Sequence, residues 1–150
     1  MLAKKFALGF GIAIIFPMTI HYGVSTFVHE PKWQDYQVEN YYQRYEEAIP
    51  EQKAQLWEEQ SRLEKQRKES EKHFQKYLFV VAIPLGVIAI IVGSISSIQA
   101  IGTGLMFGGI FSLVDGYFNY WSELADAMKF LTMLAAFIVL VFIGYRKLAK

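Results

Sequence analysis

The stretch from Leu124 to Tyr145 is apolar for about twenty residues, the length that a helix needs to cross the hydrocarbon core of a bilayer. A second apolar run, 101–121, lies immediately upstream and is joined to the first by a few polar residues. Ser122 and Glu123 are expected to cap the start of the later helix. Two such runs in tandem predict a transmembrane hairpin, so this feature places the chain among integral membrane proteins.

Two further apolar runs, 6–28 and 77–99, bring the number of expected spans to four. Between these two lies a segment, 29–76, that carries most of the charge, 20 of the 29 charged residues. We therefore predict an all-α fold, with a single four-helix membrane domain over 1–150 and a charged, helical loop between helices 1 and 2. The helix that is expected to start near Pro50 can run without a break into the second span.

The composition excludes several classes of function. The chain has no cysteine, so disulfide frameworks, thiolate metal sites and thiol redox chemistry are excluded. The formal net charge is only +1, and the aromatic and basic residues of the loop lie apart, so no nucleic-acid partner is expected. The sequence has no histidine-rich metal pattern, no nucleophile elbow and no glycine-rich phosphate loop. We expect no catalytic residue, no metal, no cofactor and no enzyme activity.

The first part of the loop sets aromatic rings among acidic and amide side chains. The rings belong to Trp33, Tyr36, Tyr41, Tyr42 and Tyr45. One interpretation is a belt of rings at the level of the lipid headgroups, where amphipathic aromatic side chains prefer to lie. The other is a recognition surface for a sugar or a peptide. The general preference of Trp and Tyr for the membrane interface favours the belt.

Small residues recur every four positions in the third span. They are Gly104, Gly108, Ser112 and Gly116. Such a row lets another helix backbone come close, and close packing drives helix association in lipid. We therefore predict a helix-packing face, and the pattern leaves open whether the contact forms within one chain or between chains.

Ionisable side chains inside a span are costly and are candidates for function. Asp115 lies seven residues before Ser122, at the tip of the predicted hairpin, and Lys129 lies seven residues after it. Both are therefore expected about 10 Å below the tip. His21 lies seven residues before the end of the first span, on the same side, and Asn119 adds a hydrogen-bond donor. The sequence thus predicts a polar layer within the membrane.

Two interpretations of this polar layer stay open. In the first, Asp115 and Lys129 form a buried ion pair that locks the hairpin, with His21 as a satisfied core residue. Charges within spans usually pair with each other, which favours this interpretation. In the second, the layer lines a path for an ion, a proton or a small solute, with a histidine that can titrate near neutral pH.

Basic residues near both ends of the chain bear on its orientation. Four spans put both termini on one side, which gathers Lys4, Lys5, Arg146, Lys147 and Lys150. The positive-inside rule places these residues in the cytoplasm. The loop itself carries nine lysines and arginines, which argues for the opposite orientation. We favour cytoplasmic termini because the first helix usually sets the topology.

Two stretches of the spans resemble known proteins: FALGFGIAIIFPMTIHYGVSTF, at 6–27, and IGTGLMFGGIFSLVDGYFNYWSEL, at 101–124. They are similar to small four-helix inner-membrane proteins of bacteria that have no assigned function. The resemblance covers the spans better than the loop. It implies the four-helix architecture and an inner-membrane location, and it carries over no functional residues.

Two functions are compatible with these features. The first is a non-enzymatic membrane scaffold or interaction protein whose polar loop contacts a partner. The second is a homo-oligomeric channel or a transporter of ions or small solutes that uses His21, Asp115 and Lys129. A chain this short needs several copies around an axis to make a pore. The expected partners are the lipid bilayer and either further copies of the chain or another membrane protein.

Overall fold

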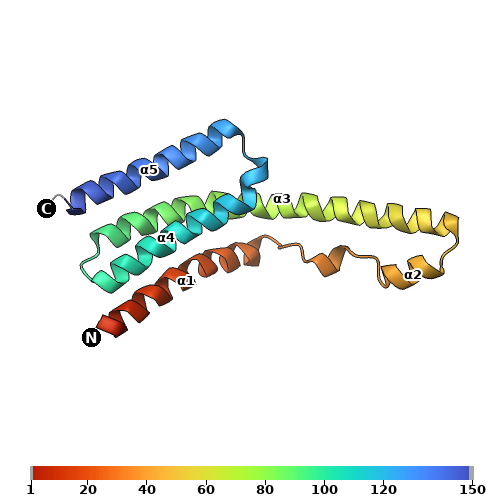
Figure 1. The fold of residues 1–150 in the computed structure, drawn as a ribbon, viewed down its shortest axis with the longest axis horizontal. Helices are drawn as coiled ribbons and strands as arrows, with labels where there is room; N and C mark the ends of the chain where they lie inside the picture. The colour runs from red at the N-terminus through yellow and green to blue at the C-terminus, as the bar shows by residue number, and fades with distance from the viewer. Residues whose placement is uncertain (1, 149–150) are drawn as a thin grey trace. The chain divides into compact units, whose positions relative to one another are not determined.

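The computed structural model describes residues 2–148, with side chains up to Tyr145. Some of the basic residues that are expected on one side of the membrane lie outside the described part of the chain. They are Lys150 and the side chains of Arg146 and Lys147. The described chain is helical throughout, with short connections (Figure 1). Its elements are α1 (Leu2–Phe27), η1 (Trp33–Tyr36), α2 (Tyr41–Glu47), α3 (Pro50–Ile95), α4 (Gln99–Tyr120), η2 (Trp121–Glu123) and α5 (Asp126–Leu148).

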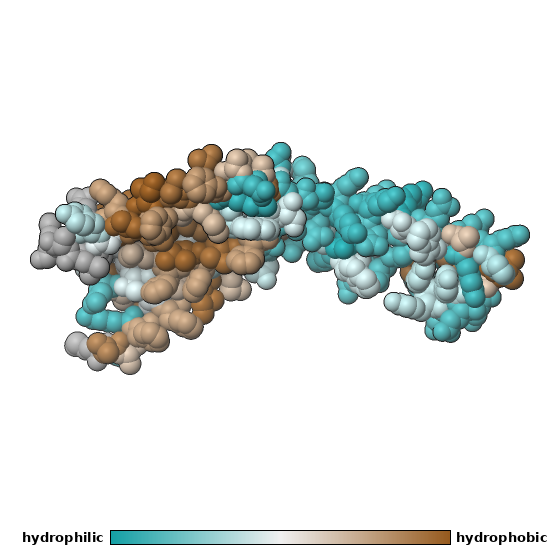
Figure 2. Space-filling view, turned by 45° about the horizontal axis from the view of Figure 1, so that its top comes forward, coloured by the Kyte–Doolittle hydropathy of each residue, from teal (hydrophilic) through white to brown (hydrophobic). Residues whose placement is uncertain are grey.

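The chain forms two compact units. Residues up to Phe27 and from Gln75 onward form the first, here called the span unit, and Val28–Phe74 form the second, the polar unit. On the face that Figure 2 shows, apolar side chains dominate the span unit and hydrophilic ones dominate the polar unit. The 46-residue helix α3 belongs to both, so the charged helix continues into the second span.

Within the described residues, four helices are long and apolar enough to cross a membrane: α1, α3, α4 with η2, and α5. This confirms the expected all-α fold with four long apolar helices. The predicted cap of the last helix is wrong, because Ser122 and Glu123 belong to η2. The N–H groups of Met128 and Lys129 instead donate to the carbonyl oxygen of Ala125, at 2.9 and 3.0 Å, which starts α5 one short connection later.

Helix α4 lies beside α1 (Figure 1). The two helices pack against each other through glycines. A Cβ atom placed on Gly104 would lie 2.6 Å from the carbonyl oxygen of Gly9. A Cβ atom on Gly108 would lie 3.0 Å from Cβ of Phe16. The contacts advance in the same direction along both helices, so α1 and α4 are parallel. Without side chains between them, the two backbones gain van der Waals contact that lipid cannot supply.

Helix α4 also packs against α3, through a second set of small residues. The contacts form the pairs Gly102–Gly93, Gly109–Gly86 and Gly116–Ala82. The residue numbers rise along α4 as they fall along α3, so these two helices are antiparallel. The glycines of α4 recur every seven residues, which is close to two helical turns and keeps them on one face. This spacing of seven is a second small-residue pattern in the sequence, separate from the row with steps of four.

The predicted packing face is therefore divided between two neighbours within one chain. Gly104 and Gly108 contact α1, whereas Gly116 contacts α3. Ser112 is 1% exposed, and its Oγ donates a hydrogen bond of 2.8 Å to the carbonyl oxygen of Gly108. Each step of four residues rotates the position by about 40° around the helix, so the ends of the row face different helices. Helix α4 is thus the centre of the packed part of the span unit.

Candidate functional site

The parallel packing of α1 and α4 brings His21 and Asp115 together. Nδ1 of His21 lies 3.3 Å from Oδ2 of Asp115, although 94 residues separate them in the sequence. The side chains are 28% and 37% exposed on the described surface. An imidazole and a carboxyl group thus face each other within two candidate spans, where a paired polar group is less costly than a lone one.

Asn119 completes a cluster of three polar residues, here called the polar cluster, with His21 and Asp115. Its Nδ2 donates to Oδ1 of Asp115 at 3.0 Å and to the backbone oxygen of the same residue at 2.8 Å. Asn119 follows Asp115 by one turn of α4, which puts the two side chains on one face. Three of the four residues expected in the polar layer therefore lie together.

Lys129 does not join the polar cluster. Its Nζ lies 3.0 Å from Oδ1 of Asp126 and 4.9 Å from the ring centroid of Trp121. The predicted Asp115–Lys129 ion pair is therefore wrong. Asp126 stands three residues earlier in the first turn of α5, so the helix itself places it beside Lys129. The backbone oxygen of Lys129 accepts a hydrogen bond of 3.1 Å from the hydroxyl of Tyr117.

The polar cluster borders a hollow of about 420 Å³ on the side of α1 and α4, next to Pro17 and Tyr22. The polar cluster offers an imidazole, a carboxyl group and an amide donor, all of which can form hydrogen bonds. In the described part of the chain, no group of three His, Asp or Glu residues is placed to hold a metal ion.

A second candidate site lies entirely within the polar unit. Eight uncharged residues line a hollow of about 370 Å³, here called the aromatic–amide hollow. They are Trp33, Gln37, Val38, Asn40, Tyr41, Tyr42, Gln43 and Gln60. They come from η1, the start of α2, the connection between them and the middle of the charged part of α3. The hollow combines rings that offer contact area with amides that both donate and accept hydrogen bonds.

Two side-chain hydrogen bonds hold the wall of this hollow against α3. The backbone N–H of Val38 donates to Oε1 of Gln60 at 3.1 Å, and the hydroxyl of Tyr36 donates to Oγ of Ser70 at 3.2 Å. Val38 is 7% exposed, so this part of the connection is buried. Asn40 then turns the chain into α2 with a φ of 55°, a left-handed conformation that asparagine tolerates better than most residues.

The tyrosines of α2 form a cluster. The ring of Tyr41 packs edge-on against that of Tyr42 and stacks on that of Tyr45, with centroids 5.7 and 5.6 Å apart. Nζ of Lys53 lies 5.3 Å from the centroid of Tyr45. Trp33 and Tyr42 remain 60% and 78% exposed at the hollow. The aromatic residues singled out in the sequence are thus partly packed on one another and partly presented outward.

The amide component of the hollow was missed by sequence reasoning. Gln60 lies within a long charged helix, and nothing in its neighbours distinguishes it from the other glutamines. Its role arises only because the connection before α2 folds back along α3.

No family model matches this chain, and no curated protein or solved structure matches it significantly. The resemblance to small bacterial membrane proteins therefore stays a prediction.

Proposed function

We propose that this chain is a multi-pass protein of the bacterial inner membrane, with cytoplasmic termini, that acts as a scaffold or interaction protein. In this proposal, the polar unit binds an extended segment of a partner protein in the aromatic–amide hollow, and the chain is not an enzyme. The observation that carries the proposal is the exposure of Trp33 and Tyr42 beside the amides of the hollow.

The chemistry of the hollow fits a peptide backbone. Trp and Tyr are enriched among the residues that contribute most to protein interfaces, because they bring a large contact area with a polar tip. Glutamine and asparagine amides can pair with both the N–H and the C=O groups of an extended chain. All eight lining residues are uncharged, in a unit otherwise rich in charge, which favours a neutral segment over a charged one.

Crosslinking from the hollow tests this proposal. A photoreactive phenylalanine analogue at Tyr42, activated in intact membranes, is expected to give a discrete adduct with one protein. The same analogue at Gln66, an exposed position of α3 outside the hollow, serves as the control and should give no such adduct. The adduct should also be lost when Trp33 is replaced by Ala. Adducts with lipid alone would contradict the proposal and support an aromatic belt at the headgroups.

The polar cluster favours a second candidate function, a homo-oligomeric channel or small-solute transporter. His21 and Asp115 are paired but partly exposed on one side of two candidate spans, where a further copy of the chain could complete a path. The mass of the protein in native membrane particles tests this candidate first. A defined oligomer, with conductance lost in Asp115→Asn, would favour it over the scaffold, and a monomer would eliminate it.

A further inference from the structure

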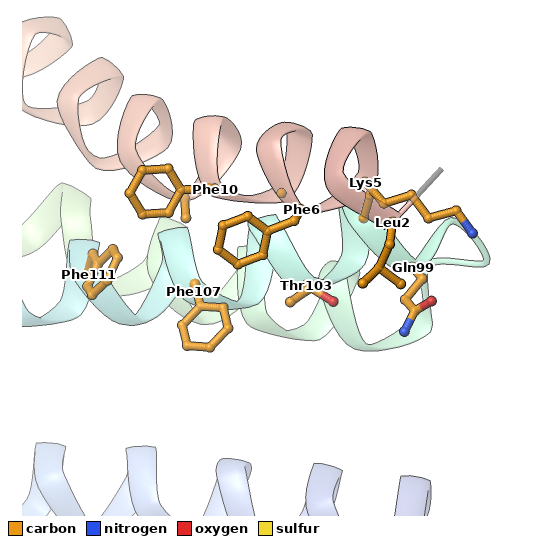
Figure 3. Close-up of a pocket in the computed structure, with 11 residues that line it drawn as sticks. Leu2, Lys5, Phe6, Phe10, Gln99, Thr103, Phe107 and Phe111 are labelled. Carbon is orange, nitrogen blue, oxygen red and sulfur yellow. The ribbon is translucent and has the colours of Figure 1, made fainter.

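A groove runs along the outer surface of the α1–α4 pair, on the part of these helices nearest to the turn between α3 and α4 (Figure 3). Its volume is about 450 Å³. Phe6 and Phe10 form the wall on α1, and Phe107 and Phe111 form the wall on α4 (Figure 3). The small residues of the helix crossing, including Gly9, form its floor.

One end of this groove is polar. Lys5 and Gln99 lie there, beyond the phenylalanine rings (Figure 3), and Lys5 is the single charged residue among the described residues that line the groove. Gln99 is also the first residue of α4, whose first turn has no acidic residue and whose N-cap makes no side-chain hydrogen bond. The positive end of the α4 dipole therefore adds to the charge of Lys5.

The length of the groove matches one leaflet of a bilayer. Gln99 and Phe111 are twelve residues apart on α4, which is about 18 Å along the helix axis. Half of a hydrocarbon core of about 30 Å is about 15 Å. A groove with a cationic end and an apolar length of one leaflet has the dimensions and the polarity of a phospholipid.

From this geometry we infer that the α1–α4 groove binds an anionic phospholipid. One acyl chain lies between the phenylalanine walls, and the phosphate is held at Lys5 and Gln99. The inference rests on the membrane location in the proposed function, but not on the partner of the polar unit. The charge of Lys5 makes an anionic headgroup the preferred occupant over a zwitterionic one.

Native mass spectrometry of the full-length protein in a non-ionic detergent tests the headgroup. The protein is offered equal amounts of phosphatidylglycerol and phosphatidylcholine with the same acyl chains. We expect one retained phosphatidylglycerol per chain and a preference that falls about fivefold in Lys5→Gln, the effect of about one basic charge at the surface. Lys4→Gln is the matched control, since Lys4 is the preceding residue and does not line the groove. It should keep the preference.

A second pair of variants tests the apolar part. Thr103 is exposed in the groove, so Thr103→Trp should fill it and abolish the retention of both lipids. Val114→Trp, at an exposed α4 position outside the groove, should have no effect. Helical content by circular dichroism checks that the variants fold, and Thr103→Phe replaces the Trp variant if it does not.

Equal effects of Lys4→Gln and Lys5→Gln would overturn the inference, because they would show general surface attraction instead of a site. Unchanged lipid retention in Thr103→Trp would overturn it as well. A failure of the membrane location is seen separately. Release of the protein from membranes by alkaline extraction would contradict the proposed membrane location. A protein that stays in the membrane but shows no lipid preference would contradict only the lipid site in the groove.

Discussion

Gly86 of α3 and Gly109 of α4 are in direct backbone contact. A Cβ atom on Gly109 would lie 2.5 Å from the carbonyl oxygen of Gly86, and one on Gly86 would lie 2.8 Å from that of Gly109. Both distances are below any that real Cβ atoms adopt, and the opposing atoms belong to backbones. A change of side-chain rotamer therefore cannot relieve the clash, and the helices would have to separate.

The first prediction concerns this contact. Gly109→Ala should lower the free energy of unfolding by about 1–3 kcal/mol, the usual cost of overpacking. Gly11→Ala and Gly23→Ala are matched controls, because a Cβ atom at either position meets nothing within 4 Å. They should be neutral or stabilising, since alanine forms helices better than glycine by about 1 kcal/mol. Unfolding in a denaturing detergent, followed by circular dichroism, measures all three. Equal losses would contradict the close contact.

The second prediction concerns the polar cluster. A double-mutant cycle with His21→Ala and Asp115→Ala should give a coupling of about 0.6 kcal/mol, the average for polar pairs between membrane helices. The same cycle with Asp115→Ala and Lys129→Ala should give none, because Lys129 pairs with Asp126. Unfolding in detergent measures both. A coupling between Asp115 and Lys129 would support the interpretation in which these two residues form a buried ion pair.

The third prediction concerns orientation. The chain has no cysteine, so single-cysteine variants need no prior removal of native thiols. With cytoplasmic termini, the turn between α3 and α4 is also cytoplasmic and the polar unit lies on the opposite side. A membrane-impermeant maleimide added to intact spheroplasts should label Glu69→Cys and spare Ser97→Cys, both exposed positions. The reverse pattern would place the polar unit in the cytoplasm.

The fourth prediction concerns the wall of the aromatic–amide hollow. Gln60→Leu removes the acceptor for the backbone N–H of Val38, which should weaken the connection between η1 and α2 by about 1 kcal/mol. Hydrogen exchange of residues 28–40 should become faster, while that of the apolar part of α3 stays the same. Gln66→Leu is the control on the same helix. Unchanged exchange in Gln60→Leu would show that this hydrogen bond does not hold the wall.

Much of the fold could be predicted from the sequence, because the length and hydropathy of a segment are local properties. Four apolar runs were enough to expect four long helices, and the structure shows that the charged helix before residue 77 continues into the second span, which the sequence left open. The proximity of His21, Asp115 and Asn119 could also be predicted. The depth of each residue in the membrane follows from the number of residues between it and the nearest end of its span.

Tertiary structure decided which residues touch. Counting residues along a helix gives the depth of a residue in the membrane but not the direction of its side chain. It therefore could not show that Lys129 pairs with Asp126 and not with Asp115. The aromatic–amide hollow depends on Gln60, which reaches it only because the chain folds back along α3.

The sequence by itself determined the number and polarity of the long apolar helices, since these follow from each segment alone. Only the tertiary structure decided that α4 has two glycine faces, one for α1 and one for α3. The physical reason is that small residues along one side of a helix let any neighbouring helix come close on that side. Which neighbour takes each face is settled by the packing of all three helices together.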